Sequence, residues 1–174
     1  AKASVVVKYV DKKGNELQDS TTTGELYVGA DYDVSDAKDV TVIEKDGKIY
    51  DFVSESSEAY TGTMPEGGVV ITRVYNTRYF YYQVQYEYKC YDENDTLIYT
   101  GNELQDVQRT TDKEVSIESD ANRTYEGYDF SRIGDVVLQA DLTGTAEDNP
   151  YVFVVEYEFH KEKTPEEPGD TPDD

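Results

Sequence analysis

The chain contains near its centre the stretch Tyr82-Gln83-Val84-Gln85-Tyr86-Glu87-Tyr88-Lys89-Cys90, in which apolar and polar side chains alternate. Successive side chains of a β-strand point to opposite faces, so this alternation predicts a strand with one buried face. The pattern returns at residues 151–159, and runs of β-branched and aromatic residues occupy 5–10 and 69–75. Helical periodicity is almost absent, with one turn expected at 33–38, so we predict a mainly β chain with little helix.

Landmarks of the first half of the chain return in the same order in the second half. The pairs are residues 7–11 and 88–92 (strand, aspartate and turn), 50–52 and 128–130 (Tyr-Asp-Phe), 61–63 and 143–145 (Thr-Gly-Thr), and closing strands expected to end at Tyr75 and Tyr157. Such self-similarity is typical of tandem repeats, here of roughly 80 residues each. We therefore predict one module at 1–78 and a divergent second module at 79–163.

The hexamer Gly-Asn-Glu-Leu-Gln-Asp also occurs twice, at 14–19 and 101–106. Its two copies are 87 residues apart, whereas the turn aspartates Asp11 and Asp92 are 81 apart. Either the second module has a longer first hairpin, with Thr96 to Thr100 extending the returning strand, or the hexamer match is partly accidental. We favour the longer hairpin.

The two modules meet at residues 76–81, which contain neither proline nor glycine. With so little free linker, we expect a stiff, elongated arrangement. Residues 164–174 differ in composition, because they are acidic and rich in proline. Such a segment cannot bury a core, so it is expected to be a disordered or extended linker.

The charge of the chain excludes several classes of partner. Thirty-eight acidic residues against sixteen basic ones give a net charge of −22. This charge repels phosphate backbones and anionic lipid surfaces, so neither nucleic acid nor a membrane surface is expected as a partner. No apolar run is long enough for a transmembrane helix, and one cysteine allows no internal disulfide. The absence of an initiator methionine and of a signal peptide suggests a piece of a larger protein. We expect this piece to be a monomer.

Two segments carry a family resemblance. Residues 6–17, Val-Val-Lys-Tyr-Val-Asp-Lys-Lys-Gly-Asn-Glu-Leu, resemble the first hairpin of MucBP (mucin-binding protein) repeats, and 61–63 followed by 70–75 resemble their closing segment. The second module departs from the pattern, with Cys90-Tyr91-Asp92 in place of Tyr-Val-Asp and no glycine in its turn. The resemblance implies β-grasp-like modules of secreted, wall-anchored adhesins of Gram-positive bacteria from mucosal habitats. It also implies host mucin or another glycoprotein as partner, and a spacer role for the tail.

Catalytic chemistry has little support in the sequence, so we expect no enzyme. The single histidine, His160, lies where the last strand runs out, and an exposed strand-end residue is expected there rather than part of a triad or metal site. Carboxylates are abundant, but a glycosidase needs a groove between two of them. Cys90 lies on an apolar face, where a buried, unreactive thiol is expected.

No cofactor is expected, although one motif resembles a calcium loop. Asp92, Asn94, Thr96 and Glu103 match the ligand spacing of a calcium loop, but Leu97 stands where such a loop needs glycine. A plain hairpin turn is the favoured interpretation, and a looser surface calcium site stays open. A covalent Lys–Asn cross-link is a separate hypothesis. It rests on Lys8 in the first expected strand and Asn76 at the end of the closing strand.

Tyrosine supplies the candidate ligand contacts, because its ring stacks on sugar faces and its hydroxyl forms hydrogen bonds. Seven of the seventeen tyrosines lie outside the alternating apolar series and are predicted to be exposed. They are Tyr27, Tyr60, Tyr79, Tyr81, Tyr91, Tyr99 and Tyr125.

The first functional hypothesis is an adhesion region that contacts mucin or another host glycoprotein or glycan. The net charge of −22 disfavours sialylated or sulfated glycans, so neutral glycans, protein backbone or calcium bridging are preferred. The alternative is a structural stalk that projects a separate binding domain from the cell wall. A third hypothesis, an accessory module of a secreted glycosidase, depends on sequence outside this chain.

Overall fold

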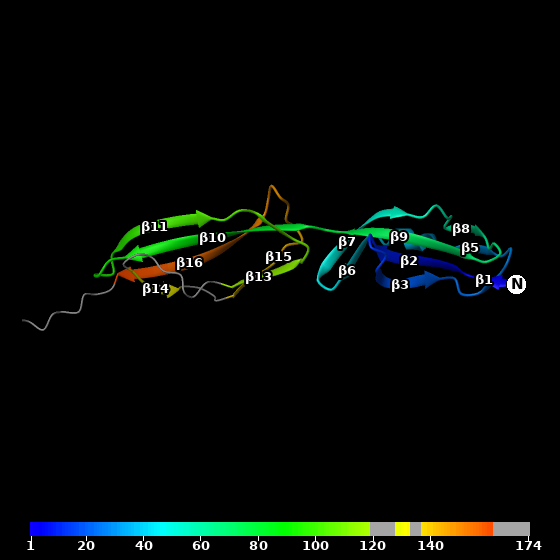
Figure 1. Ribbon diagram of the computed structural model, residues 1–174, viewed down its shortest axis with the longest axis horizontal. Helices are drawn as coiled ribbons and strands as arrows, with labels where there is room; N and C mark the ends of the chain where they lie inside the picture. The colour runs from blue at the N-terminus through cyan, green and yellow to red at the C-terminus, as the bar shows by residue number, and fades with distance from the viewer. Residues whose placement is uncertain (119–127, 133–136, 162–174) are drawn as a thin grey trace, which may run out of the picture. The chain divides into compact units, whose positions relative to one another are not determined.

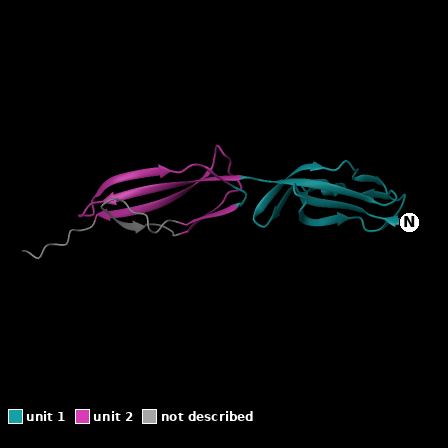
Figure 2. Cartoon of the chain, viewed as in Figure 1, with its two compact units in different colours: residues 1–79, 110–113 teal, residues 80–109, 114–174 magenta. Residues whose placement is uncertain are grey.

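The computed structural model describes residues 1–118, 128–132 and 137–161 (Figure 1). The chain is mainly β, as predicted, and its described residues contain one short 3₁₀ helix, η1 (Ser35–Asp39), close to the expected turn at 33–38. Two compact units divide the chain (Figure 2). Unit 1 holds Ala1–Tyr79 together with Thr110–Lys113, and unit 2 holds Phe80–Arg109 and Glu114–Asp174.

Unit 1 is built on a five-stranded sheet of order β3-β2-β9-β7-β6. Its central pair, β2 and β9, is parallel, and the outer strands are antiparallel to their neighbours. Two small ribbons, β1-β4 and β5-β8, complete the unit. The strands are β1 (Lys2–Ala3), β2 (Val5–Asp11), β3 (Glu16–Thr22), β4 (Leu26–Tyr27), β5 (Asp31–Asp33), β6 (Val42–Lys45), β7 (Lys48–Glu55), β8 (Thr61–Thr63) and β9 (Val69–Thr77).

The core of unit 1 lies on one face of the β2-β9 pair. Val5 and Val7 alternate with exposed or half-buried neighbours along β2, and Ile71 and Tyr75 do the same along β9. Val7 lies opposite Ile71 in the parallel register, so the two apolar rows pack as one layer. Each fully buried side chain of this size stabilises the fold by about 1.5–3 kcal/mol relative to exposure.

Unit 2 repeats the strand order of unit 1 in its main sheet, β11-β10-β16-β14, with β12 also pairing with β10. Again the central pair, β10 and β16, is parallel. A separate two-stranded ribbon joins β13 to β15. The strands are β10 (Phe80–Tyr91), β11 (Leu97–Leu104), β12 (Gln108–Thr110), β13 (Glu114–Glu118), β14 (Tyr128–Arg132), β15 (Val137–Asp141) and β16 (Tyr151–Lys161).

The core of unit 2 is aromatic. Tyr157 and Phe159 of β16 are fully buried beside Cys90 of β10, and the alternation that predicted these strands places them on one face. Tyr88 packs its ring on Tyr157 with 6.1 Å between centroids. Partly buried residues from β10 and the β13-β15 ribbon complete the cluster: Val84, Tyr86, Ile117 and Leu138.

The two first hairpins turn in the same way. The amide of Asp11 donates to the Asn15 carbonyl at 2.9 Å, and the amide of Asp92 donates to the Thr96 carbonyl at the same distance. In each turn the aspartate Oδ1 accepts two backbone amides, two and four residues later. This side-chain capping is why an aspartate begins both turns.

The favoured explanation of the repeated hexamer is therefore wrong. The returning strands begin at Glu16 and Leu97, each five residues after the turn aspartate, and β11 has eight residues against seven in β3, so hairpin length does not account for the six-residue difference between the offsets of 87 and 81. The hexamer at 14–19 spans the turn and the start of β3, whereas the copy at 101–106 spans the end of β11. The two copies occupy different positions in their hairpins, as an accidental match would.

The closing strands also run further than predicted. Strand β9 ends at Thr77 and β16 at Lys161. Tyr75 lies opposite Asp11, whereas Tyr157 lies opposite Tyr88, four residues before the second turn aspartate. Tyr75 and Tyr157 are therefore not equivalent residues of the two units.

The strand register bears on the proposed Lys–Asn cross-link. Lys8 lies opposite Thr72, and Asn76 lies four residues further along β9, opposite Asp51. At about 3.3 Å per strand residue, this offset is about 13 Å. The register therefore keeps Lys8 and Asn76 too far apart for a direct bond between their side chains.

Candidate ligand-binding surfaces

Among the candidate tyrosines that the structure describes, only Tyr60 lies in the core, so the prediction that it is exposed is wrong. Its side chain is 6% exposed. The hydroxyl donates to Glu55 Oε2 and accepts a hydrogen bond from Arg73 Nη1 at 2.7 Å. Burial, together with the bond to Glu55, raises the pKa of the Tyr60 hydroxyl. A tyrosine can be buried when its hydroxyl finds such partners.

Arg73 holds this buried polar cluster together, and the sequence analysis did not identify it. The side chain is 2% exposed, on the core face of β9. Its Nε donates to the Tyr75 hydroxyl at 3.0 Å and its Nη2 to the Val40 carbonyl at 3.2 Å, while its guanidinium lies 4.1 Å from the Phe52 ring centroid. These contacts tie the segment after η1 to the sheet, so the cluster is structural.

Three of the predicted tyrosines are exposed: Tyr27, Tyr79 and Tyr99. Tyr27 is the most accessible, with 67% of its surface exposed, and Lys2 Nζ lies 4.8 Å from its ring centroid. Tyr99 lies along β11 with its ring over Gly101, where an added Cβ would come within 2.7 Å of the Tyr99 hydroxyl oxygen. These rings are exposed but come from different parts of the chain.

Tyr81 and Tyr91 are half-buried, and Tyr125 lies outside the described residues. Tyr91 stacks on the His160 ring, with centroids 4.9 Å apart and planes 9° from parallel. His160 is itself half-buried, with Nε2 2.6 Å from Glu158 Oε1 and Nδ1 3.4 Å from Asp95 Oδ1. The expectation of an exposed strand-end histidine is therefore corrected, since its ring is held by one aromatic and two acidic neighbours.

A hollow in unit 1 has a volume of about 410 Å³. It is lined by residues of the first turn, of β7 and β9, and by Thr111: Asp11, Lys12, Lys13, Asn15, Lys48, Tyr50, Tyr75, Asn76, Thr77 and Thr111. Lysines are concentrated here in a chain that carries few basic residues. The hollow also offers a half-buried tyrosine and two asparagines, which are hydrogen-bonding groups suited to sugars.

The acidic groups around this hollow do not neutralise the positive charge of all its lysines. The Asp11 carboxylate accepts hydrogen bonds within its own turn. Desolvation raises the pKa of this carboxyl group, but the hydrogen bonds from Asn15 and Lys13 lower it, and the net shift is downward. Lys48 forms an ion pair with Asp112 at 2.7 Å. Among the described residues, Lys12 and Lys13 form no ion pair within 4.0 Å, so their charges face solvent at the rim.

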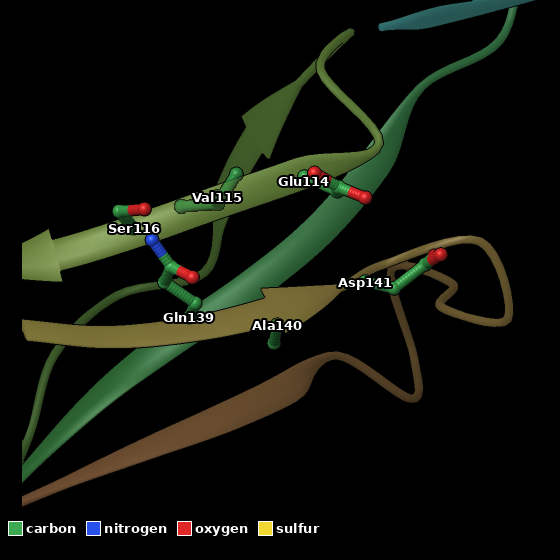
Figure 3. A pocket seen from close by; sticks show the side chains of 6 residues that line it. All are labelled: Glu114, Val115, Ser116, Gln139, Ala140 and Asp141. Atoms are coloured by element: carbon green, nitrogen blue, oxygen red, sulfur yellow. The ribbon is translucent and has the colours of Figure 1, made fainter.

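A second, smaller hollow lies on the β13-β15 ribbon of unit 2, with a volume of about 270 Å³ (Figure 3). Ser116 and Gln139 lie opposite each other across the ribbon, and Glu114 lies opposite Asp141. Figure 3 shows the Ser116 and Gln139 side chains approaching each other along one edge of the hollow. Paired carboxylates of like charge at one end make this hollow unsuited to an anionic ligand.

The calcium-loop spacing forms an ordinary hairpin turn. Asp92 Oδ1 accepts the amides of Asn94 at 2.8 Å and Thr96 at 2.9 Å, so one carboxylate oxygen already serves the turn. Within the described ranges, no group of three or more His, Cys, Asp or Glu side chains is arranged to hold a metal ion. Cys90 is fully buried, and burial raises the pKa of its thiol. In the same part of the chain, no helix is long and apolar enough to cross a bilayer.

Several solved structures are similar to this chain at low identity. A crystal structure of Mub-RV is 12% identical, with a TM-score of 0.35, and covers 92% of this chain and 99% of its own. SHIRT (Streptococcal High Identity Repeats in Tandem) domains 3-4 from a cell surface protein are 14% identical, with a TM-score of 0.32, and cover 90% of this chain and 97% of their own. The type 2 repeat of the mucus binding protein MUB from Lactobacillus reuteri is 16% identical, with a TM-score of 0.29 and coverage of 88% and 97%.

Part of the sequence matches a known domain family. No curated protein matches the chain. The MucBP domain family model matches residues 4–76, which span β2 to β9 and include the hairpin turn, the Arg73 cluster and most of the lysine-lined hollow. The expectation of MucBP repeats is confirmed for this segment, since residues 4–76 match the MucBP domain family model.

Proposed function

We propose that this chain is a non-catalytic adhesion region of a bacterial cell-surface protein that contacts host mucin or another glycoprotein. The observation that carries the proposal is the match of residues 4–76 to the MucBP domain family. The match supports a location outside the cell, and the proposal includes attachment to the cell wall through sequence beyond this chain. Residues 79–163 would form a second, divergent module, which is supported by the strand order that the two units share.

The lysine-lined hollow of unit 1 is the contact site that we propose for the glycan. Tyr50 offers a ring and a hydroxyl to a sugar, and Asn76 and Thr77 offer further hydrogen-bonding groups. Lys12 and Lys13 add positive charge locally, so acidic sugars can be accepted there although the chain as a whole carries −22. The exposed Tyr27, Tyr79 and Tyr99 are proposed as additional weak contacts.

Weak contacts of this kind become useful when they are repeated on one chain. Once one module is bound, a linked module meets its ligand at a raised effective concentration, so the overall avidity exceeds either single affinity. Mucin-type ligands carry many equivalent glycans, so the mechanism requires only modest affinity per site. A non-catalytic role is supported by the burial of the Cys90 thiol, because a buried thiol is a poor nucleophile.

A structural stalk is the second candidate function, and the segment that leaves unit 1 favours it. The amide of Arg78 donates to the Ile49 carbonyl at 2.7 Å, and its guanidinium forms a two-point contact with Asp51. These bonds fix the end of unit 1 to β7. An end that is fixed to its own sheet in this way suits a module that serves as a spacer.

Binding of the purified chain to immobilised mucin distinguishes the two functions. It should be measured with and without calcium, and before and after enzymatic removal of the glycans. Binding that is lost with the glycans is the result expected of an adhesion region. A chain that binds under none of these conditions would contradict adhesion and support the stalk.

A further inference from the structure

Strand β11 forms an open edge of the main sheet of unit 2. Among the described strands it pairs only with β10, at the end of the order β11-β10-β16-β14. Gln105 N donates to Val84 O at 2.9 Å, which fixes the phase of the antiparallel ladder. Because ladder bonds alternate along a strand, Gly101 and Glu103 bond to β10, whereas Thr100, Asn102 and Leu104 direct their N–H and C=O groups away from it.

This edge is only partly protected, by a register shift near Ile98 and by the charge of Glu103. Leu97, Ile98, Tyr99 and Leu104 are all exposed, and β11 contains neither proline nor lysine. Natural edge strands are commonly guarded by such residues, because unpaired backbone groups attract another strand. A long exposed edge that carries apolar side chains is therefore expected to have a use.

The corresponding edge of unit 1 provides an internal comparison. Strand β3 reads Glu-Leu-Gln-Asp-Ser-Thr-Thr, and its one large apolar residue, Leu17, is buried. Lys45 Nζ donates to the Glu16 carbonyl at 2.8 Å, which occupies one backbone group at the start of β3. Unit 1 thus has a polar, partly capped edge, whereas unit 2 has an apolar, open one.

The charges near β11 determine what can be added to it. Glu103 lies on the strand, and the flanking segments carry Asp92, Glu93, Asp95 and Asp106 against the single Lys89 of the neighbouring strand. A second copy of this chain brings the same acidic edge and a net charge of −22, so self-pairing is opposed by repulsion. A basic segment is attracted by the same field.

We propose that β11 is a docking site for an extended, basic segment of another protein, which adds to the sheet as an antiparallel or parallel strand. Main-chain hydrogen bonds to Thr100, Asn102 and Leu104 supply the affinity, as in other cases of strand addition. Successive side chains of the added strand point to opposite faces of the sheet. Those on the face of Glu103 would be Lys or Arg, and those on the face of Leu104 would be Val or Ile. This site is independent of the glycan contact proposed for unit 1.

Amide hydrogen exchange on the free chain tests the first part of this proposal. The amides of Thr100, Asn102 and Leu104 should exchange at least about tenfold faster than those of Gly101 and Glu103, because only the second set bonds to β10. Slow exchange at all five amides would overturn the proposal, since the edge would then already be covered by this chain or by a second copy.

Binding of a designed peptide tests the second part. The probe is a capped eight-residue peptide of alternating valine and lysine, and its control has the same sequence with every backbone amide N-methylated, so that neither edge of the peptide can donate to β11. The two have equal charge, so a preference of about tenfold or more for the unmodified peptide reports strand addition rather than attraction to the acidic chain. Equal binding of the two peptides would overturn the proposal.

Two variants locate the binding on β11. Thr100→Pro removes an outward N–H without removing a bond to β10, and proline is tolerated on edge strands. Leu104→Lys adds an edge-protecting charge and serves if the proline variant fails to fold. Either variant should reduce the preference for the unmodified peptide to about twofold or less, while the exchange protection of Gly101 and Glu103 persists. A preference that survives in a folded variant would show that the peptide binds elsewhere.

Discussion

Arg73 Nη1 donates to the hydroxyl oxygen of Tyr60 at 2.7 Å inside unit 1, where both side chains are buried. This bond converts a tyrosine that the sequence offered as a ligand contact into part of the core. It also gives the arginine of the closing segment a structural role, since the same guanidinium reaches Glu55, Tyr75 and the Val40 carbonyl.

Arg73→Ala is expected to lower the free energy of unfolding by about 3 kcal/mol, because it leaves a cavity and buried hydroxyl groups without their partner. Urea denaturation followed by circular dichroism measures the change. Arg78→Ala is the matched control, since the Arg78–Asp51 pair is more than one-third exposed on both sides and its loss should cost at most about 1 kcal/mol. Equal effects of the two substitutions would contradict the structural role of Arg73.

Gly68 is expected to be irreplaceable at the start of β9. Its φ of +78° lies in the left-handed region, and an added Cβ would collide with the Ser4 carbonyl oxygen. Gly68→Ala should therefore cost at least about 2 kcal/mol in urea denaturation. Gly144→Ala is the control, because its added Cβ meets nothing within 4 Å, and its effect should stay within about 0.5 kcal/mol. A harmless Gly68→Ala would show that the β2-β9 start is wrongly described.

The thiol of Cys90 is expected to resist modification in the folded chain. It is fully buried, and burial raises its pKa, so little reactive thiolate is present near neutral pH. Ellman's reagent should label it at least about a hundredfold faster in denaturing urea than in buffer. Rapid labelling of the folded chain would contradict the packing of β10 against β16.

Asp51 is expected to contribute to the loss of stability in acid. Its hydrogen bond from Arg78 lowers the pKa of the Asp51 carboxyl group in the folded chain. The resulting stabilisation is fully present above the unfolded pKa of about 4 and is lost as the pH falls through the lower, folded pKa. In urea denaturation the difference between the wild-type chain and Asp51→Asn should be constant from pH 7 to about pH 5 and then shrink. A difference that grows in acid would contradict this assignment.

Much of the fold could be predicted because strand alternation is a local property. The alternating residues 82–90 and 151–159 lie within β10 and β16, and their apolar members form the core of unit 2. The role of the turn aspartates is equally local, since each aspartate accepts hydrogen bonds from amides two and four residues away. Patterns that involve residues only a few positions apart can be recognised from the sequence alone.

The wrong prediction for Tyr60 depends on a partner that is distant in the sequence. Nothing near Tyr60 indicates that Arg73 will reach its hydroxyl, because the two residues meet only when β9 joins the sheet. The hexamer at 14–19 and 101–106 misled for the opposite reason, since identical letters carry no information about register. One signal was available: an arginine at an alternating core position of residues 69–75 requires buried polar partners.

Binding of the intact chain to mucin, measured by surface plasmon resonance, tests the central claim most directly. The proposed adhesion function predicts that enzymatic removal of the glycans abolishes binding, and that Lys12→Gln with Lys13→Gln weakens it at least about fivefold. Lys8→Gln with Lys89→Gln removes the same charge from exposed positions outside the hollow and should change the affinity less than about twofold. Binding that survives glycan removal, or that both double variants weaken equally, would contradict a glycan contact in the hollow of unit 1.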